Sequence, residues 1–154
     1  MRKQLRAAAV MVGVMASGGA WAGEEDVGDG DPTELPSPIA ARLHSAFPAA
    51  TVAGVERVHG GWEASIVEGM RRQDLVLDSV GNVVERHTSV AVRALPEGVR
   101  ATLDRTHPRH TVWRATEIAT EGGTFHEVFL ARGDRRTVVL LDPDGRMLAG
   151  ARRA

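Results

Sequence analysis

The sequence contains no cysteine, and this absence excludes several kinds of chemistry. Thiol catalysis, cysteine-ligated zinc and disulfide exchange all need a sulfur atom that the chain does not have. Without disulfides, the chain of 154 residues must be held together by its hydrophobic core. A chain of this length can bury enough apolar surface to do so.

Lysine is almost absent as well. Lys3 is the only lysine, and 19 Lys and Arg residues stand against 20 Asp and Glu residues. The first 22 residues hold three of these cations and no acid, so the rest of the chain keeps 16 cations and a net charge of −4. The basic footprint of a nucleic-acid-binding protein is therefore missing, and we expect no nucleic acid partner.

The apolar run near the N-terminus is too short to span a bilayer as a helix. It covers residues 7–20, follows three cations and precedes an Ala-x-Ala cleavage signal at residues 20–22. Residues 1–22 are therefore predicted to be a signal peptide, with an uncleaved membrane anchor as the alternative. We expect the mature chain, beginning at Gly23, to be periplasmic or secreted without stable membrane insertion. Residues 23–34 are acidic and almost free of apolar side chains, which predicts a flexible leader.

The rest of the sequence contains one pattern twice. Leu35-Pro36 begins the first copy and Leu95-Pro96, 60 residues later, begins the second. Each copy continues with apolar residues four apart, a second proline and a Val-rich stretch. Each then closes on an Asp-x-x-Gly segment, at residues 78–81 and 142–145. Because the order is kept and the offset drifts only in the loops, the pattern indicates duplicated structure.

Helical spacing followed by β-branched, alternating segments predicts the elements of each copy. Helices are expected at 37–47 and 96–107, the second weakened by Gly98 by about 1 kcal/mol relative to alanine. Strands are expected at 51–58, 62–66, 74–78, 83–92, 111–120, 125–131, 137–142 and 146–149. Short loops join antiparallel neighbours. The predicted fold class is therefore α+β, with two tandem repeats (residues 35–92 and 95–150). Each repeat is one helix followed by an antiparallel three- to four-stranded meander, and the helices pack on one face of the sheet. The two meanders could share one sheet or form separate lobes.

These motifs resemble PepSY-like domains. More narrowly, they resemble small exported proteins described as β-lactamase-inhibitor-like, PepSY-like. The resemblance rests on the Leu-Pro pairs, the aromatic-Pro pair at Phe47-Pro48 and the Asp-x-x-Gly turns, and it covers residues 35–149. It implies a duplicated α+β unit and a non-enzymatic exported protein that binds or inhibits another protein. It implies no catalytic residue. The second copy departs from the motif at His107, where an aromatic residue is expected.

Histidine is the natural ligand for copper or zinc in an exported protein without cysteine. No pair here has a ligand spacing with a third partner, and Pro108 separates His107 from His110. We therefore predict no metal site and no cofactor. A periplasmic small-ligand or metal carrier remains the alternative function, with ligands drawn from His44, His59, His87, His107, His110 and His126.

Catalytic constellations are missing as well. Glu63, Glu68, Glu117 and Glu127 alternate with apolar residues, as carboxylates on a solvent-facing side of a strand do. No serine lies in a Gly-x-Ser-x-Gly elbow. The chain is predicted not to be an enzyme.

The aromatic residues separate into two kinds. Trp62 and Phe125 occupy matching positions of the two copies and are expected in the core. Trp113 has no aromatic counterpart, because Ala53 stands at the matching position. Trp113 is therefore the candidate anchor of a binding surface, with a buried position as the alternative.

Arginines close to Trp113 in the expected sheet could form the rim of that surface. The alternative is a charged edge that discourages strand pairing. The sequence thus predicts a non-enzymatic binding module that engages a protein or peptide through the open face of its sheet. The candidate contacts are Trp113, Arg114, Arg132 and Arg135, with Arg136 beside them.

Overall fold

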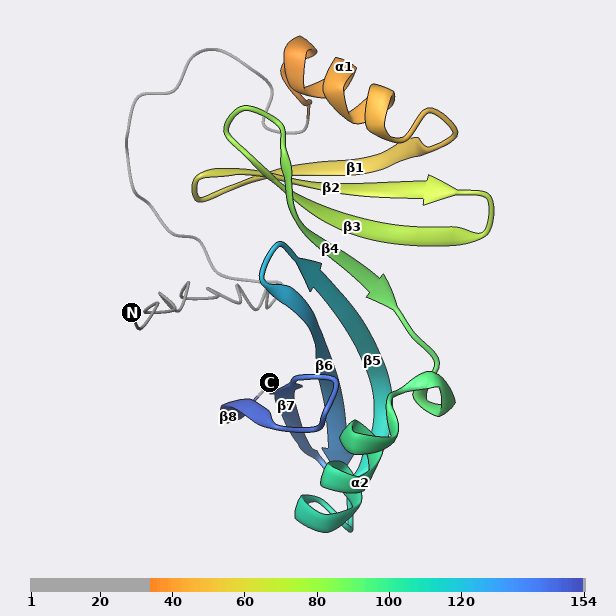
Figure 1. The fold of residues 1–154 in the computed structure, drawn as a ribbon, viewed down its shortest axis with the longest axis vertical. Coiled ribbons are helices and arrows are strands. Elements are labelled where there is room, and N and C mark those ends of the chain that lie inside the picture. The colour runs from red at the N-terminus through yellow and green to blue at the C-terminus, as the bar shows by residue number, and fades with distance from the viewer. Residues whose placement is uncertain (1–33, 154) are drawn as a thin grey trace, which may run out of the picture.

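The computed structural model of the chain describes residues 34–153 (Figure 1). The predicted signal peptide lies outside the described residues, as does the predicted leader except for Glu34. Both therefore stay predictions. No helix in the described range is long and apolar enough to cross a membrane.

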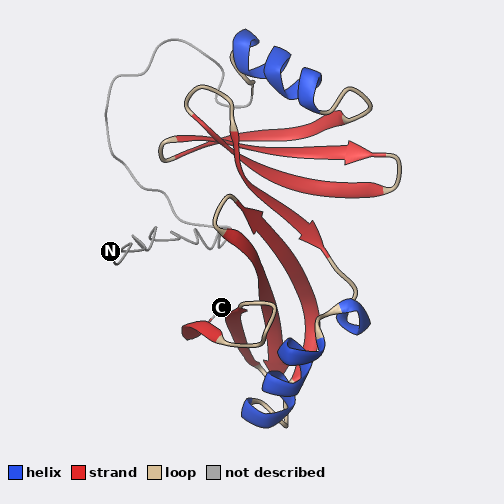
Figure 2. Cartoon of the chain, viewed as in Figure 1, coloured by secondary structure: helices blue, strands red, loops and turns tan. Residues whose placement is uncertain are grey.

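The described residues form eight strands, two α-helices and one short 3-10 helix (Figure 2). The first half consists of α1 (Ser37–Ala46), β1 (Thr51–Val58), β2 (Gly61–Glu68), β3 (Arg71–Asp78) and β4 (Val83–Ser89). The link η1 (Val92–Ala94) leads to α2 (Glu97–Thr106), β5 (Thr111–Thr120), β6 (Gly123–Arg132), β7 (Arg135–Leu141) and β8 (Met147–Arg153).

All eight of these strands belong to one antiparallel sheet. Their order in space is their order in sequence, from β1 to β8. The sheet twists strongly, and α1 and α2 lie toward its two ends, beside β1–β3 and β5–β6 respectively (Figure 1).

The predicted fold class, α+β with two tandem helix-plus-meander repeats, is therefore wrong. β4 pairs with β5 over five residue pairs, from Glu85↔Thr120 to Ser89↔Thr116, so the sheet continues across the middle of the chain. An unpaired β4 would expose a row of backbone N–H and C=O groups, and the connection through η1 and α2 brings β5 back beside it. The resulting molecule is one large sheet that carries two short helices.

The helices bury the residues that their spacing predicts. α1 buries Ile39 and Leu43, and α2 buries Val99 and Leu103. Full burial of such a side chain contributes about 1.5–3 kcal/mol. Both helices end before a proline: the Phe47 amide donates to the Leu43 carbonyl at 2.9 Å, and the His107 amide donates to the Leu103 carbonyl at 2.7 Å. His107 thus closes α2 as Phe47 closes α1.

Two hydrophobic clusters lie on the same face of the sheet. Cross-strand pairing puts one row of side chains on that face, from the first cluster to the second: Ile66, Gln73, Thr88, Glu117, His126 and Leu141. The middle of this row is polar, which explains why a continuous sheet has two separate clusters. The opposite face is called the helix-free face below. It carries the row Gly54, Ser65, Asp74, His87, Ile118 and Phe125.

The expectation that Trp62 and Phe125 are both core residues is half right. Trp62 packs in the first cluster. Phe125 pairs with Ile118 on the helix-free face, and its neighbour His126 is the residue buried on the helix side. A one-residue difference reverses the face in a strand. Aligning Phe125 with Trp62 therefore predicted the wrong face of the sheet for Phe125.

Helix α2 rests directly on the β7–β8 turn. A side chain at Gly98 would overlap the Asp144 carbonyl oxygen, and a side chain at Gly145 would overlap the Gly98 carbonyl. The turn is held by Asp142, whose carboxylate accepts the Arg146 amide at 2.8 Å. Gly98 weakens the isolated helix, but it permits this contact between two backbones.

Candidate functional site

Strands β1 and β5 each contain a β-bulge. The register shifts between Val52 and Gly54 in β1, and between Val112 and Arg114 in β5. At a bulge, two residues oppose one residue of the neighbouring strand. In β5 these two residues are Trp113 and Arg114, opposite Phe129. In β1 they are Ala53 and Gly54, so the same backbone irregularity supports a bulky surface in one half and a hollow in the other.

The bulge in β5 brings together an aromatic–arginine cluster: Trp113, Arg114, Phe129 and Arg136. The Trp113 and Phe129 rings meet edge to face with centroids 5.5 Å apart. The Arg114 guanidinium lies 5.0 Å from the Phe129 ring centroid, and the Arg136 guanidinium lies 6.0 Å from that of Trp113. Trp113 is 53% exposed. Cation–π contacts at exposed sites contribute about 0.5–1 kcal/mol each, so the four side chains support one another.

The residues that sequence reasoning singled out lie close together in the sheet. Trp113 and Arg114 are in the cluster. Arg132 and Arg135 face each other across the nearby β6–β7 hairpin and are exposed, but alternation from the buried Leu130 places them on the side of the sheet that carries the helices. Sequence reasoning missed Phe129, although its alternation with Phe125 along β6 places both on one face.

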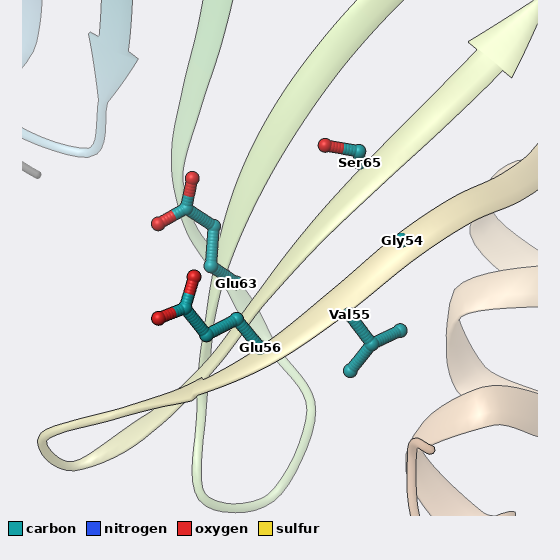
Figure 3. A pocket seen from close by; sticks show the side chains of 5 residues that line it. All are labelled: Gly54, Val55, Glu56, Glu63 and Ser65. Carbon is teal, nitrogen blue, oxygen red and sulfur yellow. The ribbon is translucent and has the colours of Figure 1, made fainter. Parts of the chain in front are cut away.

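A hollow of about 200 Å³ lies at the bulge in β1 (Figure 3). It exists because Gly54 carries no side chain opposite Ser65. Glu56 and Glu63 are cross-strand neighbours, and their carboxylates point the same way (Figure 3). The lining residues are Gly54, Val55, Glu56, Glu63 and Ser65.

Next to the hollow, the helix-free face carries a carboxylate–histidine row, defined as Glu63, Asp74, Glu85 and His87. His87 Nε2 lies 2.9 Å from Glu85 Oε2. The Ser65 hydroxyl donates to Asp74, which also forms an ion pair with the exposed Arg72 at 3.7 Å. Burial raises the pKa of the Glu63 carboxyl, and the nearby Asp74 charge raises it further, while His87 opposes the shift.

Glu63→Gln is expected to stabilise the protein at neutral pH and not in acid. A raised pKa means that the folded state disfavours the ionised carboxyl. The destabilisation is therefore absent below the ordinary pKa of 4.5 and grows as pH rises above it. Urea denaturation at acidic and neutral pH measures the difference. Glu68→Gln, at the exposed end of the same strand, is the matched control, and an equal gain at both pH values would contradict the prediction.

The histidines do not assemble a metal site in the part of the chain that the structure describes. No three His, Asp or Glu side chains there are placed to hold an ion. His107 and His110 do meet, with rings edge to face and centroids 5.1 Å apart. Burial lowers the pKa of His107, and the neighbouring His110 lowers it further. The pair packs at the end of α2, away from the carboxylate–histidine row.

Known proteins were compared with the chain at the level of sequence and of structure. The sequence matches no protein-family model and no curated protein. The structure resembles a DUF2874 family protein from Bacteroides uniformis at a TM-score of 0.71 and 17% identity, covering 78% of this chain and 90% of that one. A protein from Bacteroides eggerthii, described as a candidate periplasmic protein, gives a TM-score of 0.71 at 13% identity, with 78% and 89% covered.

A BLIP-like protein from Bacteroides fragilis is a third similar structure, with a TM-score of 0.65 at 18% identity and 79% and 89% of the two chains covered. It agrees with the β-lactamase-inhibitor-like part of the resemblance drawn from the sequence. The PepSY-like name and the tandem repeats are not confirmed. The chain shares its fold with DUF2874-family and BLIP-like proteins, and at these identities the likeness concerns the fold alone.

Proposed function

We propose that this chain is an exported, non-enzymatic binding module that holds a protein or peptide against the helix-free face of its sheet. The observation that carries the proposal is Trp113, a large apolar side chain that remains 53% exposed in a sequence with only 4% aromatic residues. Tryptophan is enriched among the residues that dominate binding energy. The two arginines of the cluster place a polar rim beside it.

Three further observations support the proposal. The sequence has no cysteine and no Gly-x-Ser-x-Gly motif, so it has neither a thiol nucleophile nor a serine in a nucleophile elbow. A protein of the same fold is described as BLIP-like. Another is described as a candidate periplasmic protein, which agrees with the export predicted from residues 1–22.

Retention of a partner from a periplasmic extract tests this function. The chain beginning at Gly23 is immobilised, and bound proteins are identified after mild washing. We expect Trp113→Ala to weaken the affinity for the retained partner by at least about 2 kcal/mol, or roughly thirtyfold, as truncation of an interface anchor does. Met70→Ala is the control, because Met70 is fully exposed on the β2–β3 turn, away from the cluster. Equal retention by wild type and Trp113→Ala would show that the helix-free face is not the binding surface.

A further inference from the structure

The two guanidinium groups of the aromatic–arginine cluster are held in place without a salt bridge. Arg114 lies over the Phe129 ring and Arg136 over the Trp113 ring. Stacking on a ring fixes the plane of a guanidinium and leaves its N–H edge free to donate. Within residues 34–153 the ion pairs are Arg72–Asp74 and His87–Glu85, so neither arginine of the cluster takes part in one.

The charges around the cluster are mainly positive. Arg132 and Arg135 flank the β6–β7 hairpin as exposed residues on the side of the sheet that carries the helices, with Asp134 in the turn between them. Glu127 is the carboxyl next to Arg114, and burial raises its pKa while the charges of His87 and Arg114 oppose the shift. On the helix-free side of β5–β7, Glu127 is the one carboxyl beside the two arginines of the cluster, so positive charge is in excess there.

The other end of the helix-free face has the opposite sign. The carboxylate–histidine row and Glu56 lie on β1–β4, whereas Arg114 and Arg136 lie on β5 and β7. The chain from Gly23 onward, with a net charge of −4, thus separates its charges along one face. Separated charge of this kind selects partners by complementarity, and like-charged segments are repelled.

We propose, building on the binding function above, that the partner segment seated on the aromatic–arginine cluster is acidic. Its carboxylates receive N–H donors from Arg114 and Arg136, in the paired geometry that guanidinium and carboxylate groups favour. An apolar side chain next to those carboxylates covers the exposed Trp113 ring. A basic segment is excluded because it would meet the unpaired arginines.

Fluorescence anisotropy with two labelled peptides tests the charge of this segment. One probe is a peptide of about ten residues that alternates Glu with Leu, and the other has Lys in place of each Glu. We expect the acidic peptide to bind, more weakly as salt increases, and the basic peptide not to bind. The double variant Arg114→Gln/Arg136→Gln is expected to weaken acidic-peptide binding about ten- to hundredfold.

The first half of the sheet offers a matched control pair. Arg57 lies over Trp62 and Arg86 over Phe47, at 5.3 and 5.2 Å from the ring centroids. Arg57→Gln/Arg86→Gln removes the same number of charges and stacks, and we expect it to leave peptide affinity unchanged. Arg114→Lys/Arg136→Lys keeps the charge but loses the planar fork, so only partial recovery is expected.

The outcomes separate this proposal from the binding function on which it rests. No binding of the acidic peptide, or equal weakening by both double Gln variants, overturns the acidic segment. Tighter binding of the basic peptide than of the acidic peptide also overturns it. Tighter binding to vesicles containing phosphatidylglycerol than to the acidic peptide does so as well. A partner from the extract that depends on Trp113 but not on Arg114 and Arg136 would leave the binding function standing and remove the acidic segment alone.

Discussion

Replacing Gly145 with alanine is expected to lower the free energy of unfolding by about 3 kcal/mol or more. Two effects add. Gly145 has a φ of +85°, a backbone conformation in which a Cβ is strained. The new Cβ would also overlap the Gly98 carbonyl and lie 2.9 Å from Thr102 Oγ1. Because the overlapping group is helix backbone, α2 must move off the β7–β8 turn. Chemical denaturation followed by circular dichroism measures the loss.

Two other glycines separate these effects. Gly133 has a φ of +57° but open space around it, so Gly133→Ala should carry only the backbone strain, about 1–2 kcal/mol. At Gly122 the nearest atom to a new Cβ would be Thr120 Oγ1 at 3.6 Å, and little change is expected. If Gly145→Ala costs no more than Gly133→Ala, the close contact between α2 and the turn is not present in solution.

Replacing Leu141 with alanine is expected to destabilise both halves of the sheet together, by about 2–5 kcal/mol. Leu141 is fully buried in the second cluster, so its truncation leaves a cavity there. Each half alone has few residues for an independent core. Since β4 and β5 are paired, loss of one half leaves the other with a long unpaired edge.

The two tryptophans of the chain from Gly23 onward report on the two halves separately. Trp62 lies in the first cluster and Trp113 on the second half. Urea unfolding of Leu141→Ala is followed by Trp62 fluorescence in a Trp113→Phe background and by Trp113 fluorescence in a Trp62→Phe background. We expect both midpoints to fall, whereas Leu148→Ala, at a position 44% exposed, should change neither. A Trp62 midpoint that stays constant would mean that the halves unfold independently.

Local patterns predicted the elements well, because local forces form them. The apolar positions four apart gave the buried faces of α1 and α2, and the prolines gave their ends. The glycine-containing turns separated strands that the structure also separates. The pairing of β4 with β5 joins residues 85–89 to residues 116–120, and no local signal encodes a contact at that separation. The sequence therefore left open whether the two meanders share one sheet, and the fold class that treated them as two repeats was wrong.

The candidate site was predictable in part. Trp113 stood out because Ala53 takes the matching position in the first copy, and Arg114 follows it directly. Phe129 was missed because its role depends on the bulge that places Trp113 and Arg114 opposite it. A bulge shifts register by one residue without a glycine or proline to mark it here. The hollow at Gly54 was missed although a lone glycine inside a strand is a signal for a bulge.

The sequence by itself determined the absence of thiol chemistry, the helix faces, the strand segments and the candidacy of Trp113. These follow from composition and from periodicities of a few residues. The tertiary structure alone decided that the strands form one sheet, that Phe125 lies on the helix-free face, and that Gly98 is needed where propensity disfavours it. Each of these depends on pairing between distant segments. The energy of that pairing comes from backbone hydrogen bonds and side-chain packing, which form only once the distant segments are in contact.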